Sequence, residues 1–244
     1  MNILTRKLAN FVSLSEADRA LLDQTTRAVR EYGPGQQVIA EGDAPDHVHL
    51  VLDGFACRYK VSDGGERSIM AYLVPGDFCD LHVFILKEMD HTIATLSPCR
   101  IAEISRSLVL QLTERPTIAR GLWWATLVDE AVLREWLVNI GRRDAVERLA
   151  HLLCELLLRL EAVGMTFGES FELPITQVEL ADTLGLSAVH LNRSMQALRA
   201  KNLITLNNKK LVVLDFDGLK ALGSFNPNYL HLAEDGRSRL AQAS

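Results

Sequence analysis

Short apolar or alternating runs separated by glycine-rich turns fill the chain from about residue 26 to residue 105. The runs are HVHLVL, FACRYKV, SIMAYLV, HTIATL and CRIAEI, and turn signals such as Asp53-Gly54 and Pro75-Gly76-Asp77 stand between them. Short strands at intervals of about 8–12 residues are typical of an all-β barrel or jelly roll. Together with an N-terminal helix that Ser15 would cap, they predict a first domain over residues 1–115.

A long helix is predicted next, over residues 116–141, and its apolar positions do not keep to one face. One stripe includes Leu122, Ala125, Val132, Trp136 and Ile140, and a second consists of Trp123, Leu127, Leu133 and Leu137. A helix that is apolar most of the way round must be buried on several sides. The barrel on one side and the same helix of a second subunit on the other would bury both stripes, and we assign the first stripe to the dimer contact. A helix buried wholly within its own chain is the alternative.

The stretch from residue 176 to residue 198, TQVELADTLGLSAVHLNRSMQAL, predicts two helices joined by a tight turn. Thr176 and Glu179 have the spacing of a capping box, which marks the start of the first helix. Gly185 supplies the positive φ that the turn needs, and Ser187 caps a second helix that runs to about Lys201. This pattern is typical of a helix-turn-helix, although an ordinary helical hairpin in a core has similar spacing.

The elements around this motif complete a second domain. A hinge at residues 141–144 and a helix from Ala145 to about Val163 precede the motif, and the apolar strands LITLNN and KKLVVLD follow it. An Asn207-Asn208 turn would join these strands into a β-hairpin wing. The chain is therefore predicted to be of the α+β class, with a winged helix-turn-helix domain over residues 142–225 and a C-terminal tail over residues 226–244.

The charge distribution favours a DNA-binding role for the helix-turn-helix. The whole chain carries a net charge of −5, whereas residues 187–210 contain five basic residues and no acidic one. A local basic patch on an acidic protein is an electrostatic footprint for phosphates. Any contact with DNA must therefore be confined to one face of the molecule.

The composition excludes several other classes. With 244 residues, of which 48% are apolar, the chain suits two modest domains or one large one. Its cysteines, Cys57, Cys79, Cys99 and Cys154, form no C-x-x-C pair, which argues against a zinc site and against a disulfide framework. The N-terminus lacks the apolar core of a signal peptide and no run approaches a membrane span, so we expect a cytoplasmic protein without a membrane partner.

In the order of its elements and in four stretches of sequence, the chain resembles the Crp–Fnr family of transcription regulators. The stretches are PGDF at 75–78, RIAEIS at 100–105, LPITQVELADTLGLS at 173–187 and LRAKNLI at 198–204. The resemblance implies a β-roll sensor, a dimerisation helix and a winged helix-turn-helix in a homodimer that is not an enzyme. Its partners would be double-stranded DNA with a near-palindromic site and, if it is an activator, RNA polymerase.

The resemblance places the family's base-reading Arg on Arg193, and an Arg can bridge the O6 and N7 atoms of a guanine. Val189 stands where the family usually has an acidic base-reader, and it could instead pack against a thymine methyl group. The target site is therefore expected to differ from the one that typical members read. Phosphate contacts fall on Gln177, Ser187, His190 and Lys209, while Asn192 and Gln196 could reach bases or phosphates.

The signal that the sensor receives is not identified by the sequence. Cyclic-nucleotide binders of the family hold the ribose with an acidic residue soon after G-D-F and neutralise the phosphate with an Arg further along. Asp80 could take the first role, but no Arg occurs between Arg67 and Arg100, so cyclic nucleotide sensing is disfavoured.

No cofactor is assigned. The iron–sulfur sensors of the family need a cysteine cluster near the N-terminus, whereas the first cysteine here is Cys57. His82, His91 and Cys79 leave a haem-dependent gas sensor possible, and Cys79 could alternatively be a redox thiol. Structural histidines and an inert buried thiol are the simpler interpretation.

A cupin-like metalloenzyme with a helical appendage is the alternative from another functional class. His47 and His49 are two apart on a predicted strand, so both would lie on one face, as in the H-x-H motif of metal-binding cupins. Those cupins place a glutamate about five residues beyond the second histidine, where this chain has Gly54. We therefore expect a pair of histidines on the barrel surface and no metal site.

Overall fold

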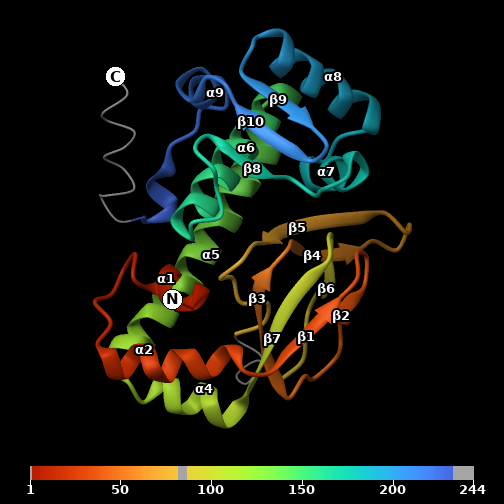
Figure 1. Cartoon of the computed structure of the whole chain (residues 1–244). Coiled ribbons are helices and arrows are strands. Elements are labelled where there is room, and N and C mark those ends of the chain that lie inside the picture. The colour runs from red at the N-terminus through yellow and green to blue at the C-terminus, as the bar shows by residue number, and fades with distance from the viewer. Residues whose placement is uncertain (1, 82–86, 233–244) are drawn as a thin grey trace.

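The computed structural model describes residues 2–81 and 87–232, and it has an N-terminal domain of helices and strands below a C-terminal helical domain (Figure 1). The chain opens with helix α1 (Ile3–Leu8), helix α2 (Glu16–Leu22) and the 3-10 turn η1 (Asp23–Thr26). Ser15 caps α2 as predicted, because its hydroxyl accepts from the backbone N of Asp18 while the Asp18 carboxylate accepts from the backbone N of Ser15.

Two antiparallel sheets make up the N-terminal β-roll. The strands are β1 (Val29–Tyr32), β2 (Gln37–Ile39), β3 (His47–Asp53), β4 (Ala56–Val61), β5 (Arg67–Leu73), β6 (Thr92–Thr95) and β7 (Cys99–Ser105). One sheet has the order β1-β7-β3 and the other has the order β2-β6-β4-β5, and apolar residues from both meet in one buried cluster. The roll is therefore confirmed, but among the described strands no ladder closes it into the barrel that the sequence predicted.

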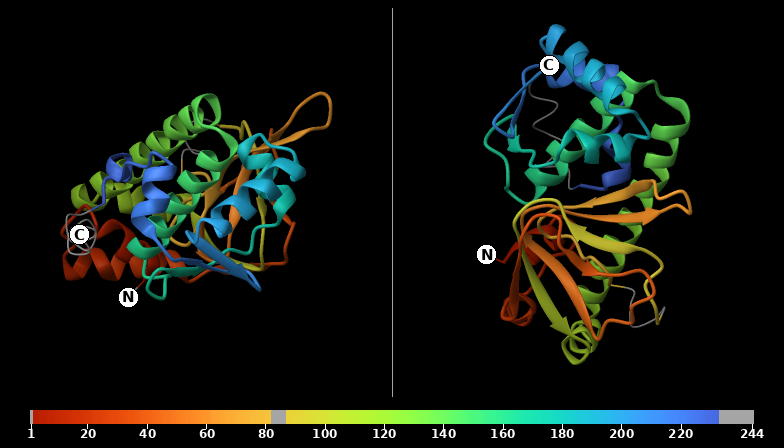
Figure 2. Two further views of the ribbon diagram at one scale, coloured as in Figure 1. Left: turned by 90° about the horizontal axis from the view of Figure 1, so that it is seen from above. Right: turned by 90° about the vertical axis from the view of Figure 1, so that its right-hand side faces the viewer.

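Helix α4 (Arg106–Thr113) leads to the long helix α5 (Pro116–Arg142), which passes along the sheets and up to the C-terminal helices (Figure 2). Pro116 occupies the first turn of α5, where its missing N–H costs nothing. The helix continues through Gly141, so the connection to the next helix consists of Arg143 and Asp144 alone.

The two apolar stripes of α5 have the reverse of the roles predicted from the sequence. Leu122, Ala125, Val132 and Trp136 are buried within the chain's own core, and of the residues assigned to the dimer contact only Ile140, 40% exposed, faces outward. The second stripe is exposed: Trp123, Leu127, Leu133 and Leu137. The assignment of the first stripe to a second subunit is therefore corrected, because the chain's own β-roll and helices already cover it.

The C-terminal domain is built around helix α6 (Ala145–Ala162), which Asp144 and Glu147 begin with a capping box. Strand β8 (Ser170–Glu172), helix α7 (Gln177–Leu184), helix α8 (Ala188–Ala200), strands β9 (Ile204–Asn207) and β10 (Lys210–Val213), helix α9 (Phe216–Leu222) and the 3-10 turn η2 (Pro227–Leu230) follow. The three strands form one antiparallel sheet of order β8-β10-β9, which confirms the wing.

The position of the wing turn differs from the sequence-based expectation. The turn consists of Asn208 and Lys209, one residue later than predicted, and both have positive φ, as a two-residue hairpin turn requires. The predicted tail begins with η2, which packs against α5. No helix in the described ranges is long and apolar enough to span a membrane.

Candidate nucleic-acid interface

The helix-turn-helix is held by the local contacts that its sequence predicts. The hydroxyl of Thr176 accepts from the backbone N of Glu179 at 3.2 Å, and the Glu179 carboxylate accepts from the backbone N of Thr176 at 2.7 Å. Gly185 has a φ of 61° and ends α7 in the left-handed conformation. Leu191 is fully buried in the joint between the two helices. The pair α7 and α8 is therefore a rigid unit.

Helix α8 separates an apolar inner face from a polar outer face. Leu191, Ser194, Met195 and Leu198 are buried in the domain. The opposite face forms one open hollow, lined by Ala188, Val189, Asn192, Arg193 and Gln196. The residues that the resemblance assigns to base reading are thus brought together, and Val189 is 60% exposed at their edge.

The N-terminus of α8 has the geometry of a phosphate-binding helix end. Ser187 is the N-cap: its hydroxyl accepts from the backbone N of His190 at 3.3 Å and lies 2.9 Å from Nδ1 of the same residue. Both side chains are exposed, as is Gln177 at the start of α7. Unpaired N–H groups and the helix dipole at such an end attract anions.

Lys209 does not join this group. It lies in the wing turn and lines a separate cleft of about 260 Å³ between the wing and the sensor domain. Asp53 from the β3–β4 turn and Glu172 from β8 line the same cleft. The structure therefore brings together the predicted α8 residues Val189, Asn192, Arg193 and Gln196, and it places the predicted wing contact Lys209 in the lining of another cleft.

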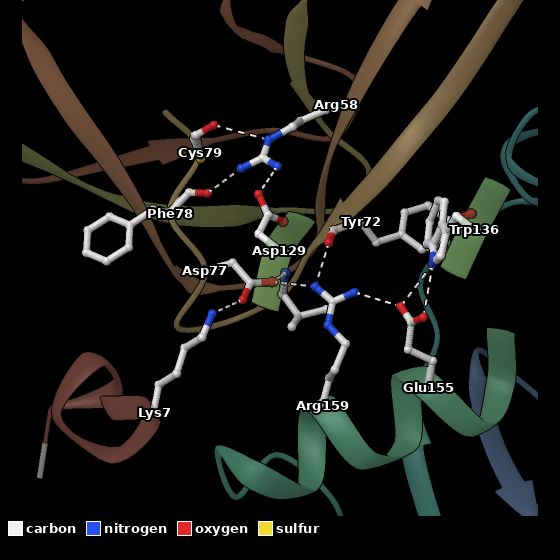
Figure 3. A network of polar contacts seen from close by, with 11 residues as sticks. Lys7, Arg58, Tyr72, Asp77, Phe78, Cys79, Asp129, Trp136, Glu155 and Arg159 are labelled. Carbon is white, nitrogen blue, oxygen red and sulfur yellow. Dashed lines mark hydrogen bonds and ion pairs between the residues drawn. The ribbon is translucent and has the colours of Figure 1, made fainter. Parts of the chain in front are cut away.

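A chain of buried charged groups joins the sensor to the C-terminal domain (Figure 3). Asp77 of the PGDF stretch is paired with Lys7, and its Oδ2 accepts from Nη2 of Arg159 at 2.7 Å. Arg159 also donates to Glu155 at 3.0 Å, and the same carboxylate accepts from Nε1 of Trp136 at 3.0 Å. The sequence analysis missed this network. The feature of the sequence that could have indicated the network is the presence of two charged residues, Glu155 and Arg159, in the otherwise apolar segment LLCELLLRL of α6.

The charges in this network set the protonation of its acids. Burial alone would raise the pKa of Asp77, but Lys7 and Arg159 outweigh it and lower the pKa to about 2. For Glu155 burial dominates, so its pKa lies above the usual value although Arg159 and Tyr229 donate to it. The sensor loop and α6 are therefore held together by a fully ionised pair.

His151 gives the fold a dependence on pH. The imidazole is fully buried between the carbonyl of Gly223 and the hydroxyl of Tyr229, each at 3.2 Å. Burial, assisted by the charge of Arg143, lowers its pKa from 6.5 to about 4. Between pH 6.5 and pH 4 the unfolded chain therefore binds more protons than the native chain, so stability falls as the pH falls through this window.

We expect the free energy of unfolding to decrease by about 2–3 kcal/mol between pH 7 and pH 4.5 because of this one group. Urea denaturation at a series of pH values measures the slope. A His151→Gln variant should lose most of it, whereas His47→Gln, which alters an exposed imidazole, should keep it. Equal slopes in the two variants would contradict this assignment.

The sensor residues are arranged differently from their sequence-based interpretation. His49 is buried rather than on the surface, and Asp80 beneath it is fully buried. Asp80 accepts from the backbone N of His49 at 2.6 Å and from its Nδ1 at 2.7 Å. Because both carboxylate oxygens have partners inside the protein, Asp80 is not open to a ribose.

The other candidate ligands do not gather into a site. No group of three or more His, Cys, Asp or Glu side chains in the described ranges is placed to hold a metal ion. His91 is buried beside Asp90, and His82 lies outside the described residues. All four cysteines are buried, and burial together with Asp80 raises the pKa of Cys79 well above its usual value. A thiol in that setting is a poor nucleophile.

The N-terminal and the C-terminal parts of the chain each match the model of a known protein family. Residues 29–115 match the model of the cyclic nucleotide-binding domain, and residues 147–222 match that of the Crp-like helix-turn-helix domain. A helix-turn-helix with an open reading face, connected by a long helix to a β-roll, defines a DNA-binding transcription regulator with a sensor domain.

The relatives agree in overall length. The transcriptional activator protein FnrL of Cereibacter sphaeroides is 32% identical over 77% of this chain and 77% of its own, and the nitrogen fixation regulation protein FixK of Rhizobium meliloti is 26% identical over 80% and 87%. The solved structure of FixK2 from Bradyrhizobium japonicum has the same fold, with a TM-score of 0.72 at 21% identity over 80% of this chain and 96% of that one. The chain belongs to the Crp–Fnr family. This membership excludes the cupin-like enzyme.

Proposed function

We propose that the protein works as a homodimer whose two α8 helices read the half-sites of a near-palindromic DNA sequence. The observation that supports a dimer is the exposed stripe of α5: Trp123 is 69% exposed, Leu127 50%, Leu133 46% and Leu137 67%. These large apolar side chains recur over about four turns of one helix, at spacings of four to six residues. Large exposed apolar side chains gathered on one side of a helix mark an interaction surface.

A second copy of the same helix is the occupant that fits this stripe. Two α5 helices related by a two-fold axis would bring each apolar residue against its counterpart, as in a coiled coil. Glu130 and Arg134 lie within the row, between Leu127 and Leu137, and their i,i+4 ion pair at 2.9 Å joins the two charges to each other. This arrangement would bury the stripe that the single chain leaves exposed.

In this proposal Arg193 and Val189 determine which DNA sequence is bound. The guanidinium of Arg193 would bridge a guanine, and the Val189 side chain would contact a thymine methyl group. Ser187, His190 and Gln177 would contact phosphates, which fix the register of the protein on the duplex. The wing residue Lys209 is exposed and would contact a further phosphate. The relative FnrL is a transcriptional activator, so we also propose that the bound dimer recruits RNA polymerase.

Selection of duplexes from a random pool by the purified protein tests the proposal. We expect the selected sequences to contain two inverted half-sites with their centres about one helical turn, or ~10 base pairs, apart. Sedimentation of the complex should give two chains per duplex. Selected sequences with a single, unrepeated half-site would overturn the proposed mode of reading.

Cyclic AMP is not expected to be the signal. Asp80 is tied to His49, and no Arg occurs between Arg67 and Arg100 to neutralise a cyclic phosphate. A ligand at 100 times its Kd stabilises a fold by about 2.7 kcal/mol, which raises Tm by several degrees. We therefore expect millimolar cyclic AMP to leave both Tm and DNA affinity unchanged. A clear rise in Tm would contradict this, and an absorbance spectrum of the same sample tests for haem, which we do not expect.

A further inference from the structure

Strand β5 forms one edge of the four-stranded sensor sheet, and helix α7 of the helix-turn-helix lies against that edge (Figure 1). Two side chains of β5 reach across to α7. Tyr72 contacts Thr183 and Arg67 contacts Asp182. The sensor domain therefore contacts the DNA-binding domain directly, and it is also connected to that domain through α5 and α6. We call the winged helix-turn-helix domain the head.

Tyr72 is the centre of this contact. Its hydroxyl lies 2.5 Å from Oγ1 of Thr183, and both groups are buried. Because Thr183 uses its single hydroxyl hydrogen to donate to the carbonyl of Glu179 at 2.8 Å, the hydrogen of the contact comes from Tyr72. Burial raises the pKa of Tyr72, so the phenol stays protonated and remains a donor.

The rest of the same residue contacts the two helices that lead to the head. Its ring meets that of Trp136 on α5 edge-on, with centroids 5.6 Å apart. Its carbonyl accepts from Nη2 of Arg159 on α6 at 2.8 Å, and Figure 3 shows the residue between these two partners. One sensor residue thus fixes α5, α6 and α7 relative to the sheet.

Arg67 adds a polar contact at the rim. Its Nε and Nη2 each lie 2.8 Å from Oδ2 of Asp182, and its guanidinium stacks over the ring of Tyr59 on β4. The stack holds the guanidinium in place and lowers the entropy lost on pairing. Neither Arg67 nor Asp182 lies in the core, so either can be replaced without opening a cavity.

The docked head keeps its reading face open. The α7 residues that touch the sensor, Asp182 and Thr183, are not among the residues that line the hollow with Val189, Arg193 and Gln196. Docking therefore does not block DNA. It restricts rotation of the head before DNA binds, so less conformational entropy is lost on binding.

We propose that Tyr72 and Arg67 are positioning residues for DNA reading, which clamp α7 against the sensor sheet and so set the half-site spacing that the dimer accepts. The inference rests on the proposed dimer, because spacing has meaning only for two heads. Without the clamp, each head would still bind a half-site, but binding of both heads to the full site would cost additional conformational entropy. They would also tolerate wrong spacings, since nothing would hold the two α8 helices at a fixed separation.

Binding to four duplexes tests the clamp. The duplexes are the site that the wild-type protein selects, the same site with its spacer lengthened by one and by two base pairs, and a single half-site. The variants are Tyr72→Phe, Asp182→Ala and the exchange Arg67→Asp with Asp182→Arg. Controls are Tyr59→Phe and Glu41→Gln; Glu41 pairs with Lys60 within the sensor and does not reach the head.

We expect Tyr72→Phe and Asp182→Ala each to lose about 5- to 10-fold in affinity for the selected site, as one hydrogen bond or ion pair would give. Their discrimination against the lengthened spacers should shrink, while half-site affinity and Tm change little. The exchange variant should recover discrimination, and the controls should match the wild type. Full spacing discrimination in the two single variants would overturn the clamp. A wild-type protein without preference for two half-sites would overturn the proposed dimer reading and the clamp with it.

Discussion

Arg193→Ala is expected to abolish sequence-specific DNA binding while the chain remains folded and fully assembled. The side chain is exposed on the outer face of α8, so its removal opens no cavity and breaks no contact that holds the domain. A bidentate Arg–guanine contact contributes about 1–3 kcal/mol of discrimination, and the dimer would lose it twice. The affinity for the selected site should therefore fall by roughly 30-fold to 20,000-fold, which fluorescence anisotropy at fixed salt measures.

Arg199→Ala is the matched control for charge. Arg199 lies on the same helix and is also exposed, but its Nη2 donates to the carbonyl of Leu206 in the wing at 3.2 Å. Both variants remove one positive charge per chain, so both weaken nonspecific binding equally. Only Arg193→Ala should also lose site preference. An Arg193→Ala protein that still selects the wild-type site would show that α8 reads DNA with other residues.

Leu137→Glu is expected to convert the protein into a folded monomer. Leu137 is 67% exposed in the single chain, so glutamate there is solvated and the fold keeps its stability. In the proposed dimer the two copies would face each other across the axis, and two carboxylates would lose water with no partner. Uncompensated burial of charge costs about 3–5 kcal/mol, which raises the dimer dissociation constant roughly 100- to 4,000-fold.

Sedimentation equilibrium with a parallel measurement of Tm separates assembly from folding. Val61→Glu is the control, because Val61 at the end of β4 is 53% exposed and does not belong to the α5 stripe. That variant should stay dimeric with an unchanged Tm. A dimeric Leu137→Glu protein would show that the exposed stripe of α5 does not form the subunit contact.

The helix-turn-helix could be read from sequence because its determinants are local. Thr176 with Glu179, Gly185 and Ser187 each act on neighbours within a few residues, and the structure has the caps and the turn at those positions. The wing turn was misplaced by one residue, since Asn207 and Asn208 both favour turns and only strand register decides between them.

The stripes of α5 could not be told apart in the same way. Both have apolar residues at helical spacing, and which one faces the core depends on the sheet and helices that pack beside it. His49 was likewise misplaced because its partner Asp80 is 31 residues away. The contact of Tyr72 with Thr183 spans 111 residues, and no local pattern signals it. The sequence therefore predicted which face of α8 could contact DNA, but not the packing contacts that orient this helix.

The 3-10 turn η2 sets a limit on how far the protein can be shortened. Tyr229 of η2 donates to the buried carboxylate of Glu155 at 2.8 Å and lies 3.2 Å from Nε2 of His151. Cutting the chain after the winged helix-turn-helix, at residue 225, would strip both groups of a partner in the interior. A minimal version of this regulator therefore ends no earlier than Leu230, and reporter fusions belong beyond that point.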